Sequence, residues 1–329
     1  MPTYNPIVQY FNHSVSIDGF LTGVQSISVD QSSSANKLTE YGRINNLKVI
    51  RPKPETRISI TRPLDNTNPP FLLTGDGDIL TYLGGVSTWD NTLKTYDIEF
   101  DLNREAPDST TGKMKTGGSS LKFRKYLLSE ARYSFSADST FAEEQLSFSG
   151  FTIEKGNGAT TSFGSADTGN VIRRHNFKKS GCTFPLEIQS LFDNSSYVLR
   201  EVNIGISFNW NNLANFGEMN AYKYRYLSFP IDITCSITLV DLKFDQPGNN
   251  DTYINPTTYS MSDILFTDSD FTPNRTIVIN AGNKIWDLGS KNYFVSRSRK
   301  GGEAGSNSYS TYTYEYKNSE NFIKIKSET

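Results

Sequence analysis

The chain has 329 residues and a formal net charge of −2, so its overall charge gives no reason to expect tight binding to nucleic acid or to an anionic membrane. Charged residues make up 21% and aromatic residues 13%, a composition that supports a folded core and excludes an intrinsically disordered chain. Abundant Tyr and Phe, with only 4 Met, favour strands and loops over helices.

The first 60 residues predict an opening hairpin and a long loop. No basic start precedes an apolar run, so we expect no signal peptide, and no stretch approaches the roughly 18 apolar residues of a membrane helix. Residues 15–21 and 23–29 predict a β-hairpin. A polar loop at 30–55 and a returning strand at 56–61 follow.

Alternation of apolar and polar residues dominates the rest of the chain and predicts strands with one buried and one solvated face. The clearest alternating apolar sets are Ile58 and Ile60; Ile98, Phe100 and Leu102; Val202, Ile204, Ile206 and Phe208; and Ile231, Ile233, Cys235, Ile237 and Leu239. Helical periodicity is weak, and only two short helices are predicted, at 78–83 and at 262–265.

The order of these elements indicates an internal repeat. One and the same spacing separates Ile27 from Ile206, Ile58 from Ile237 and Ile98 from Ile277. Strands at 126–132 and 145–149 then have counterparts at 293–299 and 311–316. We therefore predict a first domain at 1–153, a linker at 154–184 and a second, related domain at 185–329. Two different β-domains, or one large sandwich, are the alternatives.

The predicted linker is rich in Gly, Ser, Thr and Asn and carries a basic cluster of Arg173, Arg174, Lys178 and Lys179. We expect this cluster to be solvated or to contact an acidic neighbour or another subunit. The cluster contains a single Phe, Phe177, and no nucleic-acid motif surrounds it, which disfavours a nucleic-acid site.

No constellation of residues predicts catalysis. The chain has only two histidines, His13 and His175, and neither has a partner at motif spacing. Its cysteines, Cys182 and Cys235, form no CxxC pair, and Cys235 falls on the apolar side of an alternating strand. We expect no enzymatic activity, no metal site and no cofactor.

Each half resembles the tail tube domain of long-tailed bacteriophages, which also forms the tube of type VI secretion systems. The resemblance rests on the order of elements: a hairpin, a long loop containing Glu40-Tyr41-Gly42-Arg43, a returning strand, a short helix, and a closing hairpin that ends in Ser147-Phe148-Ser149-Gly150. It covers residues 11–151 well and 186–326 less well. It implies an all-β fold with one short helix per domain and two tandem tail-tube-like β-sandwich or barrel domains.

The resemblance also implies a structural protein of the virion tail, made in the host cytoplasm, whose stacked rings form a tube that conducts DNA. Sheet edges of neighbouring domains would join and close each ring. Three chains would give a homotrimeric ring of pseudo-sixfold symmetry, and a homohexamer is the alternative. Other phage tail proteins would be further partners, genomic DNA would pass without specific binding, and no membrane is involved.

Candidate contacts between subunits or rings lie in two long segments, 30–55 and 209–229, which we expect to be loops that could instead fold back over their own sheets. They are Lys37, Glu40, Tyr41, Arg43, Trp210, Asn215, Tyr222, Tyr224 and Arg225. Candidate lumen residues are Asp97, Glu99 and Asp101, because carboxylates would repel the phosphates of passing DNA. An ordinary solvated face is the alternative for these three.

Two other functions fit the same pattern. A baseplate hub or tail-tip ring protein of the same fold would form one ring rather than many. A carbohydrate-binding or adhesin β-sandwich would be a monomer with an exposed aromatic platform, for which the sequence offers Tyr309, Tyr312, Tyr314 and Tyr316.

Overall fold

The structure is a computed structural model. It describes residues 13–17, 24–32, 36–38, 48–50, 54–64, 70–83, 94–102, 119–139, 141–157, 181–185, 188–189, 197–214, 222–241, 275–300 and 310–328. Strands dominate this part of the chain, and the helical element long enough to define is α1 (Ile79–Tyr82), capped by the Asp78 side chain, which accepts from the Thr81 amide. The predicted all-β class with a short helix in the first half is confirmed, and the helix predicted at 262–265 lies outside the described residues.

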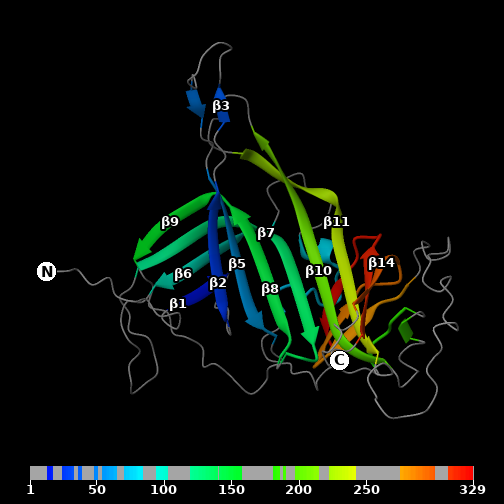
Figure 1. The fold of residues 1–329 in the computed structure, drawn as a ribbon. Helices are drawn as coiled ribbons and strands as arrows, with labels where there is room; N and C mark the ends of the chain where they lie inside the picture. The colour runs from blue at the N-terminus through cyan, green and yellow to red at the C-terminus, as the bar shows by residue number, and fades with distance from the viewer. Residues whose placement is uncertain are drawn as a thin grey trace, which may run out of the picture.

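Antiparallel strands form one long main sheet in the order β2-β5-β8-β7-β10-β11-β15-β14 (Figure 1). The strands are β2 (Ser26–Ser32), β5 (Glu55–Pro63), β8 (Glu143–Gly150), β7 (Ser119–Ser136), β10 (Tyr197–Ala214), β11 (Tyr222–Asp241), β15 (Ser310–Asn318) and β14 (Asn292–Lys300). Alternation decides which face is buried: Ile58 and Ile60 of β5 are fully buried, while Arg57 between its buried neighbours is exposed.

A second sheet branches from the N-terminal half of β7. There β6 (Tyr96–Leu102) and β9 (Thr152–Asn157) pair with β7, and β1 (His13–Ile17) pairs with β6. Strand β7 passes from this sheet into the main sheet at Lys125, a non-glycine residue with a positive φ of 56°. The predicted opening hairpin is therefore wrong, because β1 lies in the second sheet and β2 pairs with β5.

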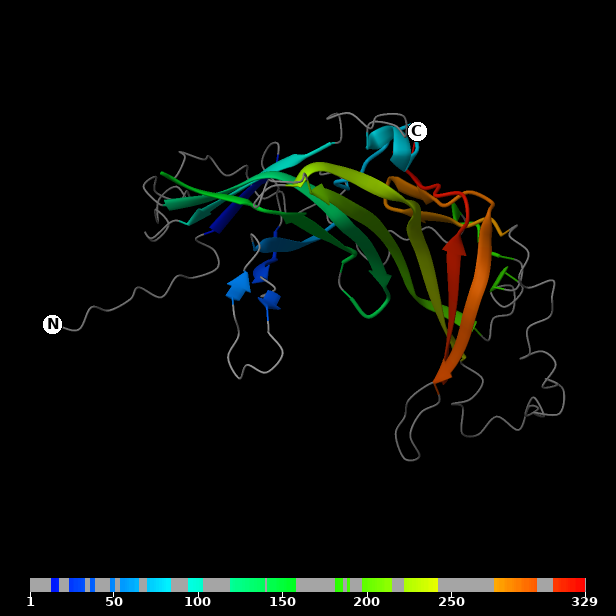
Figure 2. The same ribbon diagram turned by 90° about the horizontal axis from the view of Figure 1, so that it is seen from above.

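A third layer covers the main sheet from β8 and β7 of the first half into the second half. It consists of the segment 70–83 with α1 and of a small sheet, β12-β13-β16, whose strands are β12 (Val278–Ala281), β13 (Lys284–Asp287) and β16 (Lys324–Ser327). Figure 2 shows the main sheet as an arc, with α1 and the small sheet on its convex side. Among the described residues, nothing covers the concave side.

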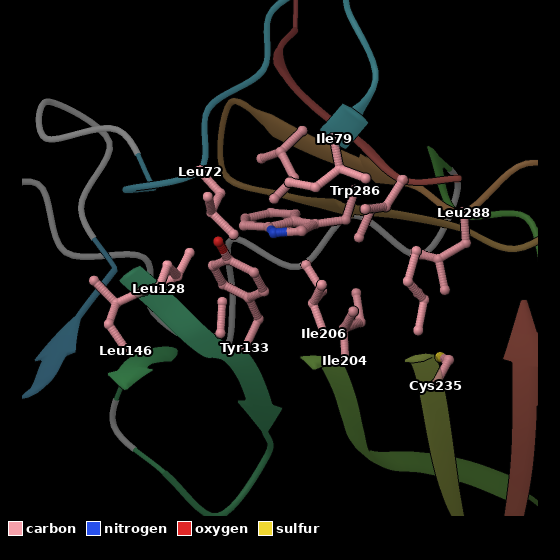
Figure 3. Close-up of a cluster of buried hydrophobic side chains, with 14 of the residues drawn as sticks. Leu72, Ile79, Leu128, Tyr133, Leu146, Ile204, Ile206, Cys235, Trp286 and Leu288 are labelled. Atoms are coloured by element: carbon pink, nitrogen blue, oxygen red, sulfur yellow. The ribbon is translucent and has the colours of Figure 1, made fainter. Parts of the chain in front are cut away.

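The core lies between the main sheet and these covering layers and draws on both halves of the chain (Figure 3). Trp286 of β13 packs against Tyr133 and Phe135 of β7, with ring centroids 5.7 Å and 4.8 Å apart. The covering segment is also hydrogen-bonded across the halves, since the Thr74 amide donates to the Ile325 carbonyl at 2.8 Å and the Ile325 amide donates to Thr74 Oγ1 at 2.8 Å.

The two halves of the main sheet have the same strand order. The first half runs β2-β5-β8-β7 and the second runs β10-β11-β15-β14, and the sequence repeat matches these strands in that order. The closing strands even share a bulge, between Leu128 and Glu130 in β7 and between Phe294 and Ser296 in β14. The halves meet where β7 pairs with β10, from Ser136 opposite Glu201 to Glu130 opposite Ser207.

Residues at both ends of the predicted linker, 154–184, pair with strands of the fold. The linker was predicted to begin at residue 154, but β9 continues to Asn157 because residues 152–157 pair with β7. At the other end, Thr183 bridges to Val278 and so joins the folded part of the chain. The division into two tandem domains stays a prediction, since strands of both halves share one sheet and one core.

Candidate assembly edges and inner wall

The two ends of the main sheet are edges of different kinds. Within the described residues, β2 pairs only with β5, and β14 pairs only with β15 apart from a single bridge between Asn292 and Arg275. An edge strand has backbone N–H and C=O groups that its own sheet does not pair, so it invites another strand. The edges therefore offer two places at which a second chain could extend the sheet.

Strand β2 has little of the usual protection of an edge, since Asp30 is its one charged side chain. It spans seven residues, contains neither Lys nor Pro, and every side chain except Ile27 is exposed. Val29 is 42% exposed although its Cα partner, Ile58, is fully buried. A long edge that exposes an apolar side chain on its core-facing side is suited to being covered by a further strand.

Strand β14 has a basic edge beyond its bulge. Its last five residues are Ser296-Arg297-Ser298-Arg299-Lys300, and Lys300 is exposed. The Arg297 guanidinium is held above two aromatic rings of β15, 5.9 Å from the centroid of Tyr312 and 5.8 Å from that of Tyr314. The bulge itself carries Val295, which is 38% exposed.

The concave side of the main sheet presents a continuous polar wall. It is formed by the alternate residues that face away from the core, which are mostly Ser, Thr and Asn: Ser28, Ser59, Thr61, Ser134, Asn203, Ser207, Thr234, Ser236, Thr238, Thr313 and Ser298. Hydrogen bonds tie neighbouring strands together on this wall, for example between Thr238 Oγ1 and Thr313 Oγ1 at 3.1 Å and between Ser59 Oγ and Ser147 Oγ at 3.2 Å.

Acidic residues outnumber basic ones on this polar wall. The acids are Asp30, Glu55, Glu130, Glu143, Glu201, Asp232 and Glu315, and the bases are Arg57, Arg132, Lys300 and Lys317. Two of the bases have acidic partners, since Arg132 pairs with Glu130 and Lys317 pairs with Asp232 at 3.7 Å. A face of this kind attracts phosphates weakly, because bases that are already paired add little positive potential.

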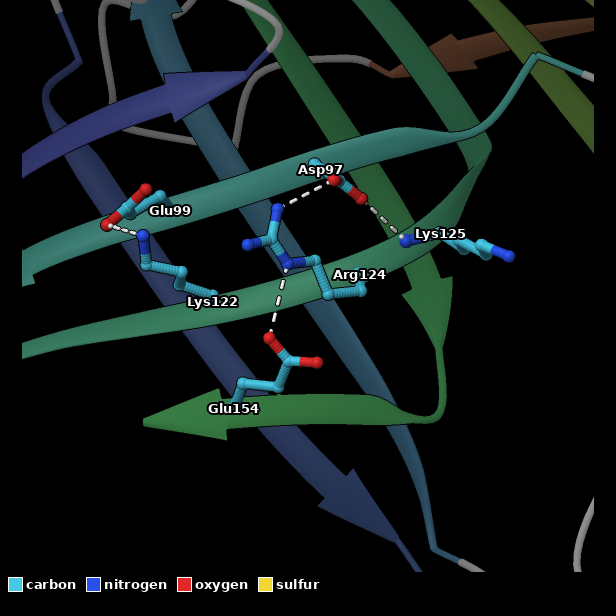
Figure 4. Close-up of polar contacts among 6 residues, drawn as sticks. All are labelled: Asp97, Glu99, Lys122, Arg124, Lys125 and Glu154. Carbon is cyan, nitrogen blue, oxygen red and sulfur yellow. Dashed lines mark hydrogen bonds and ion pairs between the residues drawn. The ribbon is translucent and has the colours of Figure 1, made fainter. Parts of the chain in front are cut away.

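The carboxylates predicted to line a lumen lie elsewhere. Asp97, Glu99 and Asp101 are in β6 of the second sheet, and Figure 4 shows the first two on the face of that sheet directed away from the main sheet. Glu99 pairs with Lys122 at 2.9 Å, and Asp97 pairs with Arg124 at 2.7 Å. A channel bounded by the concave wall would not be lined by these residues.

Asp97 has a structural role at the point where β7 changes sheets. Its carboxylate accepts hydrogen bonds from the Lys125 amide at 3.0 Å and from Arg124 Nη1 at 2.7 Å (Figure 4). Partial burial acts to raise the pKa of Asp97, but these two hydrogen bonds and the nearby cations outweigh it, so that the pKa lies below its usual value. Glu154 of β9 accepts from Arg124 Nε and completes the cluster.

The described parts of the segment 209–229, which was predicted to be a loop, are paired strands. Residues 209–214 extend β10 and pair with 222–228 of β11. In the first half, the predicted loop contains a smaller hairpin of β3 (Asn36–Leu38) and β4 (Lys48–Ile50), and both hairpins project from the same end of the main sheet (Figure 1). The polar and aromatic composition of 209–229 concealed its strands.

Two predicted contact residues of this hairpin bind the first half of their own chain. Trp210 Nε1 donates to the Leu128 carbonyl of β7 at 2.6 Å. The Arg225 guanidinium donates to the Ser149 carbonyl at 3.3 Å and lies 4.5 Å from the Phe151 ring centroid. The hairpin thus clasps the neighbouring repeat, which is the kind of contact predicted between subunits but formed here within one chain.

The remaining predicted contact residues have less structural context. Lys37 lies in β3 and Tyr222 and Tyr224 lie in β11. Glu40, Tyr41, Arg43, Asn215, Arg173, Arg174, Lys178 and Lys179 lie outside the described residues. Among the residues that are described, no group of His, Cys, Asp or Glu side chains could hold a metal ion, and no helix is long and apolar enough to cross a membrane.

Comparison with models of known protein families and with curated proteins finds no match to this chain.

Proposed function

We propose that the chain is a non-enzymatic structural subunit that assembles with copies of itself into rings, and that these rings stack into a tail tube of a bacteriophage virion through which DNA passes. The resemblance of each half to tail tube domains supports this proposal. A ring of three chains would have pseudo-sixfold symmetry, because each chain contributes two repeats.

The observation that carries the proposal is the edge-to-edge join of two repeats in one sheet. Strands β2-β5-β8-β7 and β10-β11-β15-β14 have the same order, and the last strand of the first repeat pairs with the first strand of the second. The same arrangement leaves a first-strand edge and a last-strand edge at the ends of the chain's sheet. A sheet that already continues from repeat to repeat can continue from chain to chain until it closes.

The polar concave wall would become the inner surface of such a ring. Its Ser, Thr and Asn side chains, together with an excess of acids over bases, suit a channel through which DNA must slide without being held. The covered convex side would face outward, together with α1 and the small sheet (Figure 2).

A hub or tail-tip ring remains the second candidate, because it would use the same edges and differ in the number of stacked rings. The monomeric binding module is less well supported. Tyr314 and Tyr316, two of the tyrosines that could have formed its aromatic platform, are 5% and 1% exposed and contribute to the core. They are not available to a ligand in the folded chain.

Electron microscopy of the purified protein, with light scattering for mass, tests the proposal. We expect rings of threefold or pseudo-sixfold symmetry, or hollow filaments built from them. Val29→Lys on the β2 edge should lower the yield of rings, because a charged edge resists strand addition. Val198→Lys is the matched control, since Val29 and Val198 are 42% and 44% exposed but Val198 belongs to β10, an interior strand of the main sheet. A monomer at every concentration, in the presence of the other tail proteins, would overturn the proposal.

A further inference from the structure

We propose that β2 of one copy adds antiparallel to β14 of the next copy in the register that β10 and β7 use within one chain, so that Ser28 lies opposite Lys300. This inference rests on the proposed ring function and deepens it by assigning the residues of the contact. The register itself is derived from the strand pairings within the chain.

The bulges provide the anchor that aligns the two repeats. In β7 the bulge separates Leu128 from Glu130, and in β14 it separates Phe294 from Ser296. The first residue after each bulge therefore occupies the same position in its repeat, which makes Glu130 equivalent to Ser296. The other side of the bulge agrees with this alignment. Tyr126 and Asn292 each lie four residues before the anchor, and their partners, Tyr96 and Arg275, have the same spacing as Ile98 and Ile277 of the sequence repeat.

From this anchor, directly opposed residues can be followed across each repeat on its polar face. The two series are Glu130, Ser147, Ser59 and Ser28 in the first repeat and Ser296, Glu315, Ser236 and Asn203 in the second. Both series cross the same number of strands, so they end at equivalent positions. Ser28 of β2 is therefore the counterpart of Asn203 of β10.

The internal join then gives the register between copies. Asn203 lies opposite Ser134 of β7, and Lys300 stands as far beyond the bulge of β14 as Ser134 does beyond the bulge of β7. Replacing each residue of this pair by its counterpart places Ser28 opposite Lys300. The proposed ladder between copies continues through Val29 opposite Arg299, Asp30 opposite Ser298 and Gln31 opposite Arg297, and ends with Ser32 opposite Ser296.

The chemistry of the two edges fits this pairing. The internal ladder begins at Glu130, beyond the bulge, so the equivalent bulge in β14 does not obstruct a ladder that begins at Ser296. Strand β2 carries one charge, that of Asp30, while the end of β14 is basic. Asp30 and Lys300 would be diagonal neighbours on the polar face, within reach of the long lysine side chain. Val29, exposed in the free chain, would be covered.

Disulfide trapping between copies tests the register. The paired substitutions Ser28→Cys with Lys300→Cys, and Val29→Cys with Arg299→Cys, sample both types of cross-strand pair, whose Cα atoms are about 4.5–5.5 Å apart and can be bridged. Ser28→Cys with Ser296→Cys is the matched control, because four residues along a strand add about 13 Å. The native thiols should stay unreactive, since burial raises the pKa of Cys182 to about 11 and that of Cys235 to about 12.

The assembled protein is oxidised and run on a non-reducing gel. We expect both in-register variants to give a disulfide-linked dimer and a trimer, and the control and each single-cysteine variant to give no trimer. Rings without these cross-links, or with the cross-link of the control, would overturn the register and leave the proposed function standing. Monomers without cross-links under every condition would overturn both.

Discussion

A buried ion pair joins two strands of the main sheet to the segment that covers them. Arg62 of β5 and Glu144 of β8 are 4% and 0% exposed, and Arg62 Nε donates to Glu144 Oε2 at 2.6 Å. The other carboxylate oxygen accepts from the Phe71 amide at 2.8 Å. A buried charge of this kind costs desolvation free energy that only its partners offset, so the loss of one partner is severe.

Glu144→Ala should lower the free energy of unfolding by about 3–5 kcal/mol, because it leaves the Arg62 guanidinium buried without its counter-ion and the Phe71 amide without its acceptor. Urea unfolding followed by tryptophan fluorescence measures the change. Glu143→Ala, which removes a carboxylate from the polar face one residue away, is the control. It should lower the free energy of unfolding much less. Equal losses in the two variants would refute the role given to the pair.

Asp97 should make stability depend on pH. Because its pKa is lowered on folding, the charged carboxylate stabilises the folded state fully above the ordinary aspartate pKa of 3.8, and this contribution is lost as the pH falls through the lowered folded value. Asp97→Asn keeps an acceptor oxygen but removes the charge. The difference in Tm between wild type and Asp97→Asn should be constant from pH 7 to pH 5 and should narrow below about pH 4.

Thermal unfolding monitored by circular dichroism across this pH range provides the measurement. Asp76→Asn is the control, because it makes the same charge change at an exposed turn position. If the difference in Tm between wild type and Asp97→Asn stays constant down to pH 2, the carboxylate of Asp97 does not favour the folded state.

Among the secondary-structure elements, strand identity could be predicted from the sequence and strand register could not. The alternation of β5, β6 and β11 predicts their faces correctly, and the repeat predicts which strands correspond. The common spacing, however, matches Ile58 to Ile237, whereas the pairing matches Ile58 to Cys235. A shift by two residues keeps every side chain on its face, so an alternating pattern cannot reveal it.

Contacts between distant segments could not be predicted from the sequence either. The pairing of β1 with β6 rather than a hairpin with β2, and the hydrogen bonds between Thr74 and Ile325, join positions far apart in the chain. Local patterns carry no record of such partners. The polar wall, by contrast, could be predicted as the polar side of β11, but only the structure shows that this side of the sheet is concave (Figure 2).

The hairpin of β10 and β11 should depend on Trp210 for its attachment to β7. Beyond Ser207, β10 no longer pairs with β7, and the Trp210 indole spans the gap to the Leu128 carbonyl. Trp210→Phe keeps an aromatic ring but removes the donor, and we expect a loss of about 1 kcal/mol in the free energy of unfolding. Trp210→Ala should lower the free energy of unfolding by more than Trp210→Phe does, because it also removes the aromatic ring.

Urea unfolding followed by circular dichroism checks this expectation, since the substitution removes a fluorophore. Asn211→Ala, at an exposed position of the same hairpin, serves as the control and should unfold like the wild type. If Trp210→Phe proves as stable as Asn211→Ala, the indole hydrogen bond does not hold the hairpin.

At the scale of the whole molecule, the arc and its polar wall predict how strongly the proposed ring would bind DNA. Asn203→Arg combined with Ser236→Arg adds two adjacent cations to the concave wall, because these residues lie directly opposite each other. Assembled tubes of this variant should bind short duplex DNA at least about tenfold more tightly than wild type at low salt, and the difference should vanish at high salt.

Co-sedimentation of labelled DNA with the tubes measures this binding. Asn283→Arg with Ser290→Arg adds the same charge at exposed positions of the covering layer and provides the control. Stronger retention by the control than by the concave-wall variant would indicate that the concave side is not the side that DNA meets.

The covalent link between the repeats gives the proposed ring two kinds of joint. The joint of β7 with β10 lies within one chain, so it persists at any dilution, whereas a joint of β2 with β14 depends on the concentration of free subunits. Only every second joint would then open as the protein is diluted. In a closed ring, a departing chain must break two such joints together, so subunits would exchange far more slowly than they leave an open arc.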